Sequence, residues 1–244
     1  MTISIRAALL AACLTVCAAP ASAQPANVVA GVPLEMEPNT CDRACLEAKV
    51  ESYLQAMSDG SVTDELFARS VRFTENGIEL PLGNEGLWAT TVSPTGYRLI
   101  VPDVVTGQVA ALVTVQEQAN SSATGPQRPP EPVGVSLRLR IDRDGKITEV
   151  EQIAARPDRA LGAASGPSTN PFPDIGAAVE AIGTPWDGYL QAVPEAQRHT
   201  RAELVEVANA YFEAVERNTG QDYYPFTDDC LRLDRKSTRL NSSH

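Results

Sequence analysis

The segment LEAKVESYLQAMSDGSVTDELFARSVRFTENG, residues 46–77, sets the expected fold because it joins a helical pattern to a strand and a tight turn. Its first part predicts an amphipathic helix over residues 41–58 that ends at Gly60. A helix with a continuous apolar face is expected to pack on a core. The face recurs at three- and four-residue spacing and consists of Leu46, Val50, Tyr53, Leu54 and Met57.

The second part of this segment predicts a short helix over residues 63–68, with Thr63 as its N-cap, followed by a strand. In the strand, Val71 and Phe73 alternate with polar residues, so that one face is expected to point inward. Asn76-Gly77 is a strong short-range signal for a tight hairpin turn. We therefore expect a β-hairpin after the helices.

The middle of the chain is rich in β-branched residues and predicts four further strands. Helices followed by a run of strands indicate an α+β domain, in which helices cover one face of a curved antiparallel sheet. A curved sheet packed on its first helix leaves a conical interior, and we expect a pocket there. The predicted strands are Tyr97–Val105, Gln108–Gln118, Val133–Ile141 and Lys146–Ala154.

The opening pattern recurs near the C-terminus. A similar helix begins near Leu204, and a strand pattern follows at residues 226–233. We therefore expect residues 200–233 to be the truncated start of a second copy of the same unit. Residues 234–244, DRKSTRLNSSH, match the translation of a sequencing-library adapter codon by codon, so we expect this tail to be foreign to the protein.

The N-terminus predicts export. Residues 1–23 have the pattern of a signal peptide, with Arg6 ahead of a short apolar run and Ala21-Ser22-Ala23 as the cleavage site. The run is shorter than the roughly 20 apolar residues of a membrane-spanning helix. We expect a secreted or periplasmic protein without a transmembrane anchor. A lipoprotein is the minor alternative, because residues 10–13, LAAC, resemble a lipoprotein cleavage box.

The chain is acidic, with 20 basic and 31 acidic residues and a net charge of −11. This balance, without a basic stripe, disfavours nucleic acid as a partner. Cys41 and Cys45 are near enough to form a disulfide, whereas Cys230 is left with a free thiol or a missing partner. One histidine before the tail, His199, cannot complete a zinc site, so no metal or other cofactor is predicted. The sequence does not determine the oligomeric state.

Several motifs carry a family resemblance. They are CDR at 41–43, VRFTENG at 71–77, LPLG at 80–83 and GLW at 86–88, followed by AN at 208–209, YF at 211–212, ERN at 216–218 and YPF at 224–226. Together they resemble a family known mainly from fungi and bacteria, domain of unknown function 8021. The resemblance covers roughly residues 41–233 and implies two cone-shaped nuclear-transport-factor-2-like (SnoaL-like) units in tandem. The family has no established catalytic residues, so the resemblance implies none for this chain.

These patterns suggest an order of segments along the chain. After the signal peptide we expect a flexible leader over 24–40, a first nuclear-transport-factor-2-like domain over 41–156 and a linker with a short helix over 157–199. The second, truncated unit and the adapter-derived tail follow.

Glu75 is the best candidate for an acid–base catalyst, because it shares the inward face of its strand with Val71 and Phe73. The alternative is a structural carboxylate satisfied by Arg98, Arg138 or backbone amides. Arg138 itself is expected on the outer face of the sheet. The chain has no Ser-His-Asp grouping and no Gly-rich phosphate loop.

Four aromatic residues are expected to line the pocket as ligand-binding residues, although such residues are also ordinary core. They are Tyr53, Phe73, Trp88 and Tyr97. A non-catalytic binding or scaffolding domain with a small apolar ligand fits these residues best. The alternative is a lyase, isomerase or hydrolase that uses Glu75. A buried Glu75 beside Tyr or Trp polar atoms in an enclosed cavity would favour the enzyme.

Overall fold

The structure is a computed structural model. It describes residues 40–118, 129–157 and 174–217, together with 219, 224, 226, 231–234 and 237–240. The predicted signal peptide, nearly all of the leader and part of the linker therefore lie outside the described residues. Within the described ranges no helix is long and apolar enough to cross a membrane.

Helix α1 (Arg43–Asp59) confirms the helix predicted at the start of the domain. Asp42 caps its N-terminus, since its carboxylate accepts a hydrogen bond of 2.9 Å from the amide of Cys45. Gly60 ends the helix in the left-handed conformation at φ 61°. Cys41 and Cys45 form a disulfide across the first turn, with a Cα–Cα distance of 5.2 Å. The predicted apolar face is fully buried.

The helix predicted for residues 63–68 is absent, and this prediction was wrong. The Thr63 carbonyl accepts hydrogen bonds from the amides of Leu66 and Phe67, which closes a single turn. Strand β1 (Phe67–Glu75) begins directly afterwards. Phe67 already pairs with Ile147 in the sheet, so the chain extends where the local pattern favoured a helix.

The sheet has six strands in the order β2-β1-β6-β5-β4-β3. All the strands predicted for residues 71–154 are present, and Asn76-Gly77 forms the expected turn with φ values of 51° and 81°. The remaining strands are β2 (Ile78–Glu79), β3 (Thr91–Asp103), β4 (Gln108–Glu117), β5 (Glu131–Ile141) and β6 (Ile147–Ala155).

One strand pair differs from the expected antiparallel arrangement, because β1 and β6 are parallel. The chain leaves the β1–β2 hairpin and starts β3 at the opposite edge. It then returns strand by strand through β4 and β5, so that β6 arrives beside β1 in the same direction.

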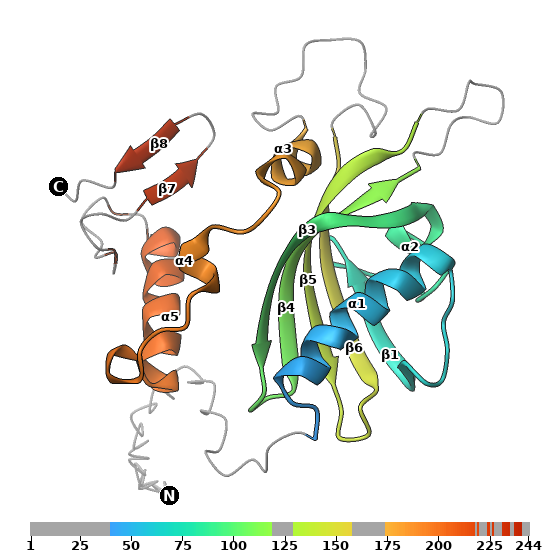
Figure 1. Cartoon of the computed structure of the whole chain (residues 1–244), viewed down its shortest axis with the longest axis horizontal. Helices are drawn as coiled ribbons and strands as arrows, with labels where there is room; N and C mark the ends of the chain where they lie inside the picture. Colours follow the sequence, from blue (N-terminus) through green and yellow to red (C-terminus); the bar gives the residue numbers. More distant parts are fainter. Residues whose placement is uncertain are drawn as a thin grey trace, which may run out of the picture. The chain divides into compact units, whose positions relative to one another are not determined.

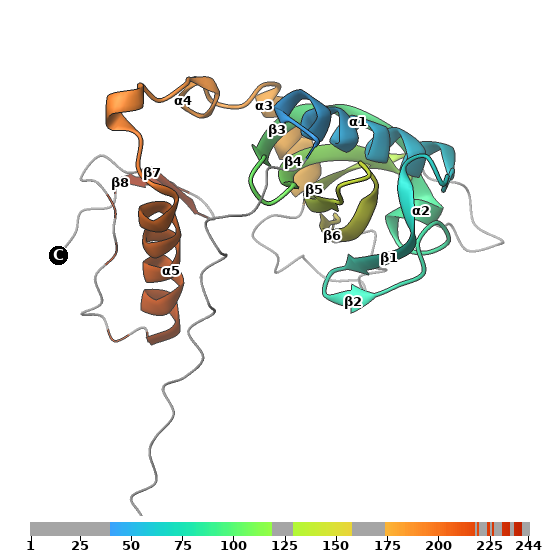
Figure 2. The same cartoon turned by 90° about the horizontal axis from the view of Figure 1, so that it is seen from below.

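Helix α1 lies across the face toward which the sheet curves, as Figures 1 and 2 show. The inward residues of β4 and β5 alternate with outward ones, and the core between helix and sheet is almost entirely aliphatic and aromatic. Short helix α2 (Leu87–Thr90) closes one end of this core and brings in Trp88. Helix α3 (Ile175–Ile182) packs mainly on β5. The predicted α+β class is confirmed.

The C-terminal part contains α4 (Asp187–Leu190), α5 (Arg201–Arg217), β7 (Leu231–Asp234) and β8 (Ser237–Leu240). Helix α5 begins with a capping box, since Glu203 accepts a hydrogen bond from the amide of Thr200 and its own amide donates to the Thr200 hydroxyl. Helix α5 has the apolar pattern of α1, but Phe212 is 68% exposed. The second copy of the unit stays a prediction.

Candidate functional site

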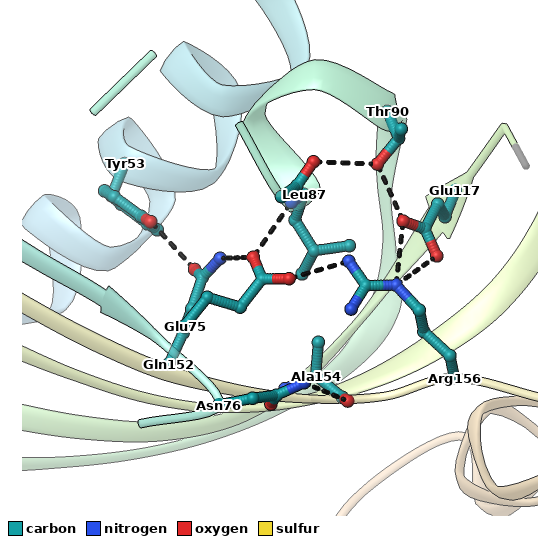
Figure 3. Close-up of polar contacts among 10 residues, drawn as sticks. Tyr53, Glu75, Asn76, Leu87, Thr90, Glu117, Gln152, Ala154 and Arg156 are labelled. Atoms are coloured by element: carbon teal, nitrogen blue, oxygen red, sulfur yellow. Dashed lines mark hydrogen bonds and ion pairs between the residues drawn. The ribbon is translucent and has the colours of Figure 1, made fainter. Parts of the chain in front are cut away.

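Glu75, at the end of β1, is buried with 5% of its surface exposed. Its Oε1 atom accepts a hydrogen bond of 2.7 Å from Nη2 of Arg156. Its Oε2 atom accepts bonds from Nε2 of Gln152 at 2.8 Å and from the amide of Leu87 at 2.9 Å. Both carboxylate oxygens are thus held by donors of the same domain (Figure 3).

The carboxylate of Glu75 also anchors helix α2. The amide of Leu87 is the first of that helix, so Glu75 supplies the cap that the local sequence lacks. Gly86 makes this approach possible, because a Cβ atom there would lie 2.3 Å from Oε2 of Glu75. Its φ of 61° also favours glycine. Trp88 therefore depends on Glu75 for its position.

Arg156 connects Glu75 to a second buried carboxylate, Glu117 at the end of β4. Its Nε atom donates to Oε2 of Glu117 at 2.8 Å and to Oε1 at 3.0 Å. The hydroxyl of Thr90 donates to Oε1 of Glu117 at 2.7 Å. Burial lowers the pKa of the Arg156 guanidinium, but the two carboxylates outweigh this effect and the net shift is upward. Arg156 therefore stays charged.

On the other side of Glu75 the network continues to the aromatic core. The Tyr53 hydroxyl donates to Oε1 of Gln152 at 2.8 Å and accepts a bond of 3.1 Å from the indole of Trp88. Burial raises the pKa of Tyr53 well above its usual value, because no solvent reaches the phenolate form. Its hydroxyl thus serves as a fixed donor.

The predicted ligand-binding residues are only partly brought together. The rings of Tyr53 and Trp88 meet edge to face with centroids 5.5 Å apart, and Phe67 completes this group at 5.8 Å from Trp88. Phe73 and Tyr97 are also buried, but neither makes a ring contact with the described residues. Whether these four residues contact a ligand stays a prediction.

The partners of Glu75 differ from those expected. Arg98 forms an ion pair with Glu51 and Arg138 pairs with Glu149 and Glu151 on the outer face, so neither reaches Glu75. The expected backbone amide is present, as Leu87. The expected charge partner is replaced by Arg156, which lies just beyond the end of β6.

The sequence interpretation missed Gln152, Arg156 and Glu117. A signal for two of them exists, because Gln152 and Glu117 occupy inward positions of strands whose other inward residues are apolar. A polar residue in such a row needs a partner and therefore points to a buried network. Arg156 follows the last predicted strand and had no comparable signal.

Two further features bear on ligands. The described residues include no group of three or more side chains suited to hold a metal ion. A groove of about 540 Å³ beside the second half of α1 is lined by polar residues such as Gln55 and Asp59, and by Pro94 of β3. None of the predicted site residues lines it.

Comparisons with known proteins agree with the resemblance in part. The family model described as "Domain of unknown function (DUF8021)" matches residues 197–240. No curated protein matches the chain significantly. The described helices and six-stranded sheet have the α+β arrangement expected from the sequence, apart from the parallel β1–β6 pair.

Several solved structures are similar to the chain. AclR from Streptomyces galilaeus, a proposed hydroxylase, has 16% identity and a TM-score of 0.38, with 51% of this chain and 96% of AclR covered. IdmH from Streptomyces antibioticus, a proposed polyketide cyclase, has 19% identity and a TM-score of 0.36, with 48% and 98% covered. A proposed polyketide cyclase from Xanthomonas campestris pv. campestris has 15% identity and a TM-score of 0.33, with 46% and 90% covered.

Proposed function

We propose that residues 41–156 form a small-molecule-binding domain of an exported protein and that its role is not catalytic. The binding site in this proposal is the interior end of the sheet around Glu75, bordered by Trp88 and Tyr53. The observation that carries the proposal is that donors of the same domain bind both oxygens of Glu75, including an ion pair of Arg156 with Oε1. A carboxylate that acts as a base must direct a lone pair at its substrate. Here the donors of Arg156, Gln152 and Leu87 occupy both oxygens.

Export is supported by two independent features. The first is the signal-peptide pattern of residues 1–23. The second is the disulfide between Cys41 and Cys45, since disulfides persist mainly in oxidising compartments. We place the mature protein in the periplasm or outside the cell.

A catalytic role is the second candidate, and one observation favours it. Glu75 is buried and is connected through Gln152 to the hydroxyl of Tyr53, which is a fixed hydrogen-bond donor. A buried carboxyl group linked to a phenol is an arrangement that isomerases use. In this candidate Arg156 would have to release Glu75 when substrate binds.

The two tryptophans of the chain provide a test of ligand binding. In a protein labelled with ¹⁵N at the indole, Trp88 reports on the interior, whereas Trp186 is 67% exposed and serves as the internal control. Trp186→Phe assigns the two signals. We expect small apolar aromatic fragments to shift the Trp88 signal in a saturable way and to leave Trp186 unchanged. A fragment set that never moves Trp88 would refute the proposed site.

A further inference from the structure

The buried charges around Arg156 do not balance. Glu75 and Glu117 both accept hydrogen bonds from this guanidinium, and the other described contacts of the two carboxylates also come from donors. Two carboxylates and one guanidinium carry a net charge of −1. Burying an uncompensated charge is costly, so such a group is expected to attract a cation.

Glu117 has room for one more donor. Its Oε1 atom accepts from Thr90 and from Arg156, but its Oε2 atom accepts only from Arg156 among the described residues. A carboxylate oxygen accepts two hydrogen bonds. One lone pair of Glu117 is therefore open to a further donor. Glu131 faces Glu117 across the β4–β5 pairing and has a contact of its own, so the net charge of −1 refers to Glu75, Glu117 and Arg156 alone.

Thr91 provides a second, independent indication of a ligand. It is 7% exposed, and its hydroxyl has no hydrogen-bond partner among the described residues. Thr91 lies directly opposite Glu117 in the β3–β4 pairing, so the two side chains share one face of the sheet. A buried hydroxyl without a partner is rare in native proteins. A ligand that donates to Thr91 would remove this deficit.

We propose that this end of the interior binds an organic cation with an apolar body and one primary ammonium group, for which Glu117 and Thr91 are the acceptors. An ammonium group carries the single positive charge that the cluster lacks, and it has donors for both oxygens. A metal ion fits less well, because the described residues offer no group of three ligands. The apolar body would extend from Glu117 past Thr90 toward Trp88 of the same short helix α2. This inference rests on the proposed function and names its ligand class.

Three compounds with the same ring and different charge test the inference: benzylamine, benzyl alcohol and benzoate. Each is titrated into the full chain while the Trp88 indole signal is followed. We expect benzylamine to bind at least about tenfold more tightly than benzyl alcohol, and benzoate to bind least. Benzyl alcohol or benzoate binding as tightly as benzylamine would overturn the inference.

Two variants identify the acceptors. Glu117→Gln and Thr91→Val should each lower the affinity for benzylamine and have little effect on the affinity for benzyl alcohol. We expect Glu117→Gln to lower the benzylamine affinity by about tenfold or more. Glu149→Gln, a carboxylate change on the outer face, is the matched control and should bind benzylamine normally. An unchanged benzylamine affinity in both site variants would contradict the assignment. If Glu117→Gln does not fold, the benzylamine affinity of Thr91→Val and the selectivity of the unaltered chain among the three compounds still test the inference.

The outcomes separate this inference from the proposed function. If neutral fragments shift Trp88 and an ammonium group adds nothing, only the inference fails. If no compound of any charge shifts Trp88, the proposed function fails with it.

Discussion

Replacing Gly86 with alanine tests the close approach of the Glu75 carboxylate to residue 86. A Cβ atom at this position would lie 2.3 Å from Oε2 and 2.7 Å from Cδ of Glu75. The carboxylate would have to move, and its bonds to Leu87 and Gln152 would be lost or stretched. Hydrogen bonds to a charged group contribute about 1.5–3 kcal/mol each, so we expect this displacement to cost about 3 kcal/mol. The backbone conformation adds about 1–3 kcal/mol.

A double-mutant cycle separates the two contributions. In a Glu75→Ala background the side chain that collides with residue 86 is gone, so Gly86→Ala should cost only the backbone part. In a Glu75→Gln background an atom still occupies the position of Oε2, so the steric collision with residue 86 should persist, although the hydrogen bonds lost no longer involve a charged group. Gly60→Ala is a reference for a left-handed glycine, at φ 61° and ψ 30°, with no atom within 4 Å of the added Cβ; Gly86 has the same φ but a ψ of −139°. Gly60→Ala should cost about 1–2 kcal/mol.

Urea unfolding followed by tryptophan fluorescence measures these free energies. We expect the Glu75→Ala, Gly86→Ala double variant to be about 3 kcal/mol more stable than the sum of the single changes predicts. Additive effects, within about 0.5 kcal/mol, would refute the claim that Gly86 is required by the approach of Glu75.

Three further predictions concern charge and covalent structure. Arg138→Gln should raise the pKa of Glu149 in a carboxyl NMR titration, because the hydrogen bond from Arg138 lowers it in the native protein. The stability that this pair contributes is present above the usual Glu pKa and is lost as the pH falls through the lowered value, so an unchanged Glu149 titration would contradict the pairing. Burial raises the pKa of Tyr53 above its usual 10.0, so tyrosinate absorbance from this residue should appear only on unfolding. The free energy of unfolding should fall as the pH rises above 10.0. If alkaline titration of folded Tyr53→Phe shows one tyrosinate fewer than the folded unaltered chain, Tyr53 ionises in the folded protein and the prediction is wrong. Reduction of the Cys41–Cys45 disulfide should lower the free energy of unfolding by about 2 kcal/mol, the value expected for so short a loop. A change near zero would contradict this prediction and show that the first turn of α1 is stable without the disulfide.

The fold was largely predictable from local pattern. The apolar face of α1 and the Asn76-Gly77 turn determine the first helix and hairpin, because both depend on residues close in sequence. The parallel pairing of β1 with β6 was not predictable in this way, since it joins residues such as Phe73 and Val150 that are far apart in the chain. The turn at Thr63 was misread because its helical signals extend over one turn only, and pairing of Phe67 outweighs them.

The site was predictable only in outline. The inward position of Glu75 follows from strand alternation, and the structure confirms that it is buried. Its charge partner does not follow, because Arg156 lies beyond the end of a strand and reaches Glu75 only through the folded sheet. The role of Gly86 is also a tertiary effect. A glycine in a loop has many local explanations, and the nearby carboxylate comes from another element.

The most direct test of the central claim, binding without catalysis, is the chemical fate of a bound ligand. A compound that shifts the Trp88 signal is incubated with the full chain and recovered, and its mass and stereochemistry are measured. We predict that it is recovered unchanged, because Glu75 is held by Arg156, Gln152 and Leu87. Conversion of the compound by the unaltered chain, abolished in Glu75→Gln, would contradict this account and assign Glu75 a catalytic role.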